Sequence, residues 1–202
     1  GHPLTIPLAV ALGCDTFDSA SYILYAKHDR YIEEDKTSHL PNIKYFSCTC
    51  EVCTKFSPKE ILSLENEEKV NQVALHNLFA IKAEVDRVKE SIHEGRLWEY
   101  VMKKMRAHPK LFEAIDVFTK SSEYFLSTTP KFKERSIFLF SKEDQYRPEV
   151  FAYQDTMQKF KTKKKIVVLT KNTITKPAYL TSEYSILKER LNDSGAIQFC
   201  YY

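Results

Sequence analysis

Three cysteines and one histidine have the spacing of a metal site. Cys48, Cys50 and Cys53 fall within six positions, and His76 lies on a later segment with helical patterning. Three thiolates and one imidazole form the donor set that tetrahedral zinc accepts in structural sites. Four protein ligands leave no open position for a reactive water. We therefore expect one structural zinc ion (Zn²⁺) that fastens the loop at 41–54 to the helix; free thiols beside a histidine that only hydrogen-bonds are the less favoured alternative.

A carboxylate is the second group with chemical potential. Residues 14–18 read as a short strand that ends at Asp18, the position where barrel folds place catalytic side chains. A carboxylate is ionised near neutral pH and can act as a nucleophile. Asp15 in the same strand is the second choice, and a plain loop or cap carboxylate is the structural alternative.

One long amphipathic helix must carry the histidine. The pattern predicts it from Asn66, as its cap, to about Gly95, with apolar residues at alternating steps of four and three. His76 lies roughly opposite this apolar stripe and is therefore expected to point away from the main core, as a ligand should. The stripe consists of Val70, Ala74, Leu78, Ile81, Val85, Val88 and Ile92.

Shorter elements surround this helix. Pro3 opens a helix that Gly13 ends, and Ser57 with Glu60 forms a capping box for another. Further helices are expected at 97–107, from 109 onward, at 149–160 and at 184–191, with a loop or short helix at 19–27. Strands are expected at 136–140, 166–170 and 196–201, so a second, smaller α+β unit begins after Pro130.

Composition sets the class of protein. With 202 residues and 43% hydrophobic content the chain can bury a core, and its net charge of +3 permits a nucleic-acid partner without demanding one. The chain has 4 glycines and no glycine-rich phosphate loop, which argues against a Rossmann or P-loop enzyme. No apolar run suits a membrane span or a signal peptide. Five cysteines with three clustered indicate a reducing, cytoplasmic setting.

Taken together, these residues resemble the archaeal-type tRNA-guanine transglycosylase family of the archaeosine pathway. The likeness runs in order through roughly three quarters of the chain. The motifs that carry it are Gly1-His2-Pro3, the segment 13–22 with Phe17-Asp18-Ser19-Ala20-Ser21-Tyr22, the three clustered cysteines, Leu75-His76-Asn77-Leu78, 94–99, Ala107-His108-Pro109 and Arg147-Pro148-Glu149-Val150.

The resemblance implies a fold class and two domains. The class is α/β: residues 1–129 would be the C-terminal part of a catalytic (β/α)₈ barrel with a zinc-binding helical insertion. Residues 130–202 would be the small α+β domain that follows. Family members begin with most of the barrel and end with an RNA-binding PUA domain, and neither matches this sequence. We therefore expect the chain to be inactive alone and to need an N-terminal half on the same or another chain.

The resemblance also implies an activity. Family enzymes are transferases that exchange guanine at position 15 of tRNA for 7-cyano-7-deazaguanine (preQ0) through a covalent aspartate intermediate, which makes Asp18 the expected nucleophile. Expected partners are tRNA, the two bases and the N-terminal half, in a homodimer or heteromeric assembly. Two alternatives remain: a non-catalytic zinc-bearing subunit for dimerisation or tRNA docking, and a paralogue resembling archaeosine synthase.

Other residues allow a structural or an RNA-binding interpretation. Lys27, Arg30 and Arg96 fit contacts with tRNA phosphates as well as a solvated surface. The lysine cluster at 159–165 reads as a solvated charge run, and Trp98 reads as a packing residue.

Overall fold

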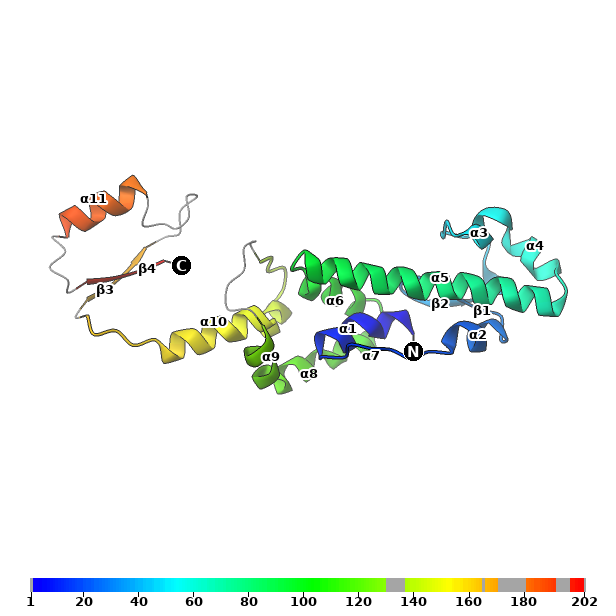
Figure 1. Cartoon of the computed structure of the whole chain (residues 1–202), viewed down its shortest axis with the longest axis horizontal. Helices are drawn as coiled ribbons and strands as arrows, with labels where there is room; N and C mark the ends of the chain where they lie inside the picture. The colour runs from blue at the N-terminus through cyan, green and yellow to red at the C-terminus, as the bar shows by residue number, and fades with distance from the viewer. Residues whose placement is uncertain (1, 130–136, 165, 171–180, 192–196, 202) are drawn as a thin grey trace. The chain divides into compact units, whose positions relative to one another are not determined.

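The computed structural model describes residues 2–129, 137–164, 166–170, 181–191 and 197–201. By their internal packing the residues form two compact units, Gly1–Tyr153 and Gln154–Tyr202 (Figure 1). The first unit is largely helical and contains all the candidate site residues. Within the described part of the chain, no helix is both long and apolar enough to cross a membrane.

The first unit opens with the predicted helix. It comprises the 3-10 turn η1 (Pro3–Thr5) and helix α1 (Ile6–Ala11), and Gly13 follows with a φ of +96°. The prediction of a strand at 14–18 was wrong. All of these residues are described, and they run without secondary structure to α2 (Ser21–Ala26). A strand needs a partner for its backbone groups, and no described segment pairs with this one.

A short hairpin follows α2. Strands β1 (Arg30–Ile32) and β2 (Thr37–His39) are antiparallel, with Tyr31 opposite Ser38. The chain then passes through η2 (Leu40–Asn42) and the cysteine loop into α3 (Glu51–Lys55) and α4 (Pro58–Ser63). The capping box that the sequence predicts for α4 is present.

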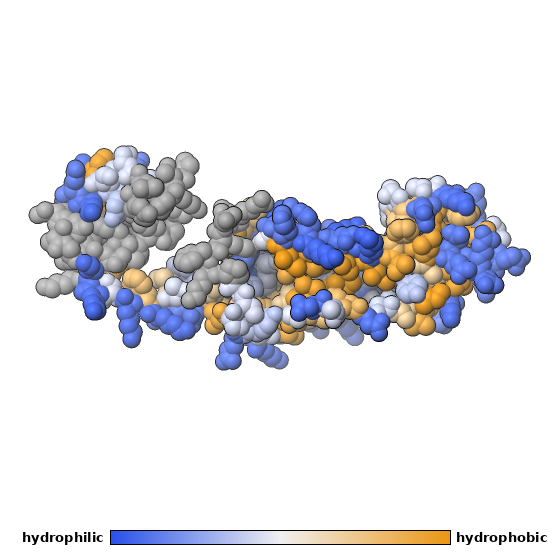
Figure 2. Space-filling view, viewed as in Figure 1, coloured by the Kyte–Doolittle hydropathy of each residue, from blue (hydrophilic) through white to orange (hydrophobic). Residues whose placement is uncertain are grey.

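Helix α5 (Asn66–His93) is the longest element, and Glu65 rather than Asn66 occupies its N-cap. Its buried face differs from the predicted stripe. Leu78 and Ile92 are 48% and 50% exposed, whereas Glu84 and His76 are each 1% exposed. The rotation has a physical cause. The hairpin and α2 pack beside His76 and supply hydrogen-bond partners there, and Glu84 pairs with Lys104 at 3.0 Å. Figure 2 shows hydrophobic surface on the first unit along α5 and α1.

A second group of helices completes the first unit. Helix α6 (Leu97–Met105) is followed by short helical segments, and their apolar faces meet around Trp98, Met102 and Phe118. Trp98 is a packing residue, as predicted, and its indole N–H also donates to Asp144 at 2.8 Å. The short segments are α7 (Pro109–Phe112), η3 (Glu113–Ile115), α8 (Asp116–Lys120) and α9 (Ser122–Thr128).

Residues 137–153 belong to the first unit. Of the strand predicted at 136–140 the structure describes 137–140, which form none, so this prediction was wrong for them. The reason lies in Arg147, which is fully buried and donates to the carbonyl of Phe138 at 2.8 Å and to Glu99 at 3.1 Å. This anchoring explains why the boundary between the two compact units follows Tyr153, whereas the sequence suggested a domain boundary at 129/130. The 3-10 turn η4 (Lys142–Tyr146) lies in this stretch.

The second unit is small. Helix α10 (Pro148–Lys159) leads into it, and strands β3 (Ile166–Thr170) and β4 (Ile197–Tyr201) pair in parallel. Helix α11 (Ser182–Arg190) lies between them in sequence, as a parallel pair requires a crossover. These two strands and two helices were predicted. The described strands form two separate two-stranded sheets, so the barrel strands implied by the family stay a prediction.

Candidate metal centre

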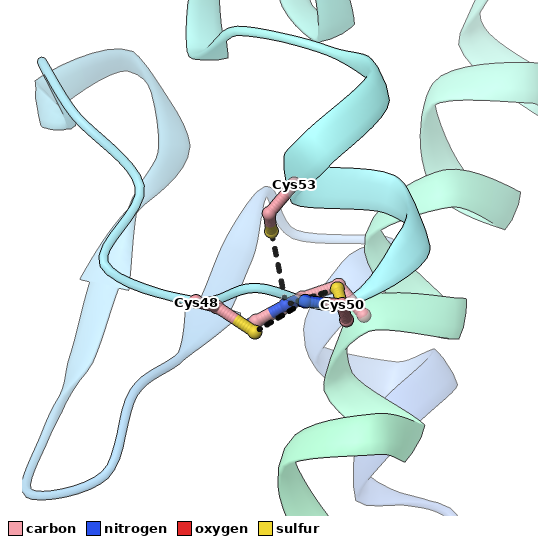
Figure 3. Close-up of side chains that lie close together, drawn as sticks. Cys48, Cys50 and Cys53 are labelled. Carbon is pink, nitrogen blue, oxygen red and sulfur yellow. Dashed lines mark hydrogen bonds between the residues drawn. The ribbon is translucent and has the colours of Figure 1, made fainter.

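The four predicted ligands converge on one point. Cys48 and Cys50 lie on the loop before α3, and Cys53 lies in α3 (Figure 3). His76 reaches them from α5. Their four donor atoms all lie within 4.8 Å of one another. Residues 28 positions apart in sequence therefore form a single donor cluster, which could hold a metal ion.

The spacing of the donor atoms suits a tetrahedral ion. Nδ1 of His76 lies 3.5 Å from Sγ of Cys50 and 3.4 Å from Sγ of Cys53. A tetrahedral zinc ion with usual bond lengths places a nitrogen and a sulfur ligand about 3.6 Å apart. The four donor types, and the two distances from His76, thus fit zinc.

The far side of the His76 ring is held by the hairpin. Nε2 donates to the carbonyl of Ile32 at 2.9 Å, which leaves Nδ1 as the lone-pair nitrogen that faces the thiols. Burial lowers the pKa of His76 to about 4, so the ring stays neutral and ready to ligate. The expectation that His76 points away from the core was wrong. It is buried, and its partners are the hairpin and the cysteine loop.

Tyr31 contacts two of the four candidate ligands. Its ring stacks on His76 with centroids 3.7 Å apart and planes 7° apart, and its hydroxyl lies 3.1 Å from Sγ of Cys53. Burial and the neighbouring Cys53 raise the pKa of Tyr31, so the hydroxyl keeps its proton. It can therefore donate to the sulfur once that sulfur is a thiolate.

Burial affects the protonation of the thiols. Burial raises the pKa of both Cys48 and Cys53 above the ordinary thiol value. Without a cation these two groups therefore favour the protonated form, and a bound metal must displace those protons. The backbone N–H of Cys50 also points at Sγ of Cys48, 3.4 Å away, as a donor to a thiolate would.

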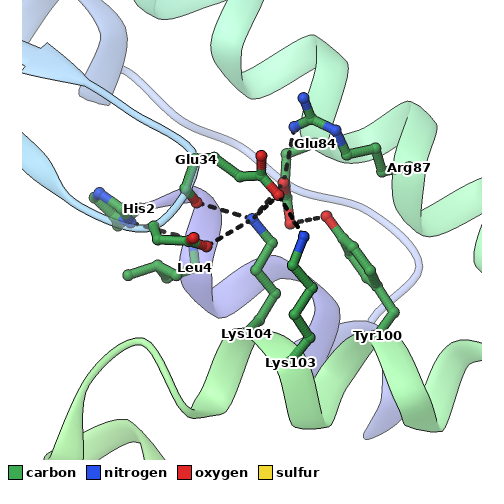
Figure 4. A network of polar contacts seen from close by, with 9 residues as sticks. His2, Leu4, Glu34, Glu84, Arg87, Tyr100, Lys103 and Lys104 are labelled. Atoms are coloured by element: carbon green, nitrogen blue, oxygen red, sulfur yellow. Dashed lines mark hydrogen bonds and ion pairs between the residues drawn. The ribbon is translucent and has the colours of Figure 1, made fainter. Parts of the chain in front are cut away.

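A groove of about 370 Å³ borders the cluster. Its wall runs from Cys50 and His76 along α5 to Glu84 and Arg87. At that end a polar network joins α5 and α6 to the turn of the hairpin (Figure 4). The hairpin that positions His76 is therefore fastened at its turn as well as at β1.

Asp18 lies elsewhere. It is exposed, in the segment between α1 and α2, and it does not belong to the donor cluster. Ser19 next to it accepts a hydrogen bond from the backbone N–H of Ser21 at 3.2 Å, which connects this segment to the start of α2. Asp15 is exposed too, as are Lys27, Arg30 and Arg96.

Sequence reasoning assigned no role to three residues around the cluster. Tyr31, Ile32 and Asn77 position it, yet each acts through a contact between segments 22 to 45 positions apart. One signal was available. Asn77 follows the histidine directly within the Leu75–Leu78 motif, and a buried asparagine needs several hydrogen-bond partners.

The chain is similar in sequence to known proteins. A family model described as queuine tRNA-ribosyltransferase matches residues 1–110. The tRNA-guanine(15) transglycosylase of Sulfolobus acidocaldarius is 43% identical over 171 residues, which cover 84% of this chain and 34% of the relative. The proteins of the same name from Methanocaldococcus jannaschii and Pyrococcus furiosus are each 42% identical, over 88% and 81% of this chain and 28% of each relative.

The match and the cluster cover the same part of the chain. All four donor residues and Asp18 fall within the residues matched by the family model. The chain spans about a third or less of the length of these curated relatives. Since the family model covers more than half of its residues, this chain belongs to the queuine tRNA-ribosyltransferase family.

Proposed function

We propose that this chain is the nucleophile-bearing part of a tRNA-guanine transglycosylase that exchanges guanine at position 15 of tRNA for 7-cyano-7-deazaguanine. The observation that carries the proposal is the identity of about 40% with three tRNA-guanine(15) transglycosylases over more than four fifths of the chain. Residues 1–129 are then the end of a (β/α)₈ barrel, and tRNA and the N-terminal part of the enzyme are its partners, in an assembly of two or more chains in the cytoplasm.

Asp18 is the nucleophile in this proposal. Its carboxylate attacks C1′ of the ribose, the bond from C1′ to N9 of guanine breaks, and guanine leaves with a proton from an acid in the N-terminal part. The incoming base gives its N9 proton to the same group, now deprotonated, and attacks C1′, which breaks the ester bond to Asp18. The exposure of Asp18 supports this role, since a macromolecular substrate must reach it.

The cluster holds one structural zinc ion in this proposal. Cys48, Cys50, Cys53 and His76 would be the ligands, and the ion would supply a fixed link between the cysteine loop and α5. The residues themselves do the positioning. Ile32 orients the imidazole and Tyr31 supports Cys53, so the ligands are held in place from the hairpin side.

Base exchange in an assembled enzyme tests the proposal. The chain is combined with the N-terminal part that the family's barrel requires, and incorporation of labelled guanine into tRNA is measured. Asp18→Asn should abolish exchange, because an amide cannot form the ester intermediate. Asp15→Asn is the matched control and should keep most of the activity. Full activity of Asp18→Asn would assign this chain to a non-catalytic subunit instead.

A further inference from the structure

Two consecutive residues of α5 bond to the edge of strand β1 that does not face β2. His76 donates to the carbonyl of Ile32 at 2.9 Å, and Oδ1 of Asn77 accepts from the N–H of the same residue at 2.8 Å. The amide nitrogen of Asn77 also donates to the carbonyl of Arg30 at 3.0 Å. The two side chains therefore satisfy backbone groups that a neighbouring strand would otherwise pair.

Asn77 has one more partner, and it lies on α2. Its amide nitrogen donates to the carbonyl of Tyr22 at 3.1 Å. Asn77 is completely buried, so each of its three bonds matters to a group that water does not reach. One side chain thus connects the strand that orients the metal ligand His76 with the helix that follows Asp18.

The connection continues from α2 to Asp18. Tyr22 lies in the first turn of α2, and the N–H of Ser21 bonds to the hydroxyl of Ser19. Ala26 at the other end of α2 is buried against Val73 and Ala74 of α5. The position of the segment before α2 therefore depends on how firmly α2 is held on α5.

We propose that Asn77 couples the metal cluster to the Asp18 segment, so that metal binding orders α2. The inference rests on the proposed metal site. In it, the position of the proposed nucleophile Asp18 depends on bound metal. Metal binding fixes the ring of His76 and, through Tyr31 and Ile32, strand β1. A fixed β1 keeps Asn77 in the orientation in which it also bonds to Tyr22. Loss of the metal loosens the cysteine loop and β1, and with them the hydrogen bond from Asn77 to Tyr22 of α2.

Hydrogen exchange on the chain itself tests this coupling. Amide exchange is followed by mass spectrometry in zinc and after chelation, in the peptides that cover α2, the cysteine loop and α6. In the unaltered chain, chelation should speed exchange about tenfold in the loop and about fivefold to tenfold at α2, where the amides of Leu24 and Lys27 are bonded. Helix α6, in the other hydrophobic cluster, should not respond.

Asn77→Asp isolates the coupling. It keeps the acceptor for Ile32 and removes the donors to Tyr22 and Arg30. Zinc should still slow exchange in the cysteine loop of this variant, whereas α2 should exchange at the fast rate with or without zinc. Asn71→Asp, an identical change at an exposed position of the same helix, should behave as the unaltered chain.

Two results would overturn the inference. One is zinc-dependent protection of α2 that persists in Asn77→Asp. The other is an α2 that does not respond to zinc in the unaltered chain, and this result decides the matter even if the variant fails to fold. Absence of stoichiometric zinc binding would refute the metal site, and an active Asp18→Asn enzyme would refute the nucleophile. Neither of those outcomes resembles the pattern that tests Asn77.

Discussion

Nζ of Lys104 lies 3.0 Å from Oε2 of Glu84, and both side chains are 1% exposed. The pair joins α6 to α5. Lys104 also donates to the backbone carbonyl of Glu34 at 2.8 Å, and Tyr100 donates to the other oxygen of Glu84 at 2.8 Å. The buried charges are therefore compensated from several sides, and the turn of the hairpin depends on them (Figure 4).

Removal of the lysine charge should be strongly destabilising. Lys104→Met removes the buried cation beside Glu84 and leaves its carboxylate only the partly exposed Arg87, 3.3 Å away, so we expect a loss of about 3 kcal/mol in the free energy of unfolding. Urea denaturation at constant zinc concentration measures this loss. Lys103→Met is the matched control: Lys103 is 60% exposed and pairs with Glu34, so its loss should stay below about 1 kcal/mol.

A double variant separates burial of charge from packing. Glu84→Gln added to Lys104→Met removes the buried negative charge, and Gln can still accept from Tyr100. It should therefore recover part of the lost stability. Equal costs for Lys104→Met and Lys103→Met would contradict this account of the network.

The hydroxyl of Tyr31 should strengthen metal binding. Tyr31→Phe keeps the ring that stacks on His76 but removes the donor to Cys53, so we expect zinc affinity to fall about tenfold, at the lower end of effects for residues that support ligands. Competition with a coloured chelator measures the affinity. Tyr45→Phe, at a side chain that is 88% exposed, should leave the affinity unchanged. A Tyr31→Phe chain that binds zinc as tightly as the original would show that stacking alone positions the ligands.

The metal-free chain should lose stability in mild acid. Burial lowers the pKa of His76 to about 4, from an ordinary value near 6.5. Between these two pH values the unfolded chain binds a proton that the folded chain does not. This contribution to stability is therefore complete above about pH 6.5 and falls by up to about 3 kcal/mol as the pH approaches 4.

Urea midpoints at pH 7.5 and pH 5, with a chelator present, measure this dependence. His76→Gln should remove most of it. His93→Gln, at an exposed position at the end of the same helix, should leave it intact. His2 adds a smaller slope in the same direction, because burial also lowers its pKa. Equal pH slopes in the two variants would refute the assignment to His76.

Replacement of Gly13 should be destabilising. Its φ of +96° is unfavourable for other residues, and a Cβ there would lie 2.5 Å from the hydroxyl oxygen of Tyr124. Gly13→Ala should cost about 2–3 kcal/mol in thermal or urea unfolding. Gly95→Ala has only the cost of a positive φ, about 1 kcal/mol. Similar costs at both positions would show that Tyr124 moves aside freely.

The sequence predicted well what short-range patterns determine. The donor set of Cys48, Cys50 and Cys53, the capping box at Ser57 and most of the helices depend on residues a few positions apart. His76 could be chosen because it stands on a strongly periodic helix and within a family motif. These features can be predicted without knowing which distant segments are in contact.

The failures concern contacts between distant segments. Residues 14–18 have strand composition, but a strand forms only where a partner takes its hydrogen bonds. The buried side of α5 was misjudged because Glu84, His76 and Asn77 are polar, and only the hairpin and α6 make their burial favourable. The anchoring of 137–153 by Arg147 was likewise invisible, since its partner Glu99 lies 48 positions earlier.

The cysteine cluster has a consequence for the unfolded chain as well. A metal that joins Cys48 to His76 closes a loop of roughly 29 residues, as a disulfide would. By the usual chain-entropy relation such a cross-link disfavours the unfolded ensemble by about 3–4 kcal/mol. The loop also keeps α3 and α4 beside the start of α5 while the rest of the unit is unfolded. A zinc-bound denatured chain should therefore have fewer conformations to sample and should refold faster. The lifetime of the folded chain should follow the rate at which zinc dissociates.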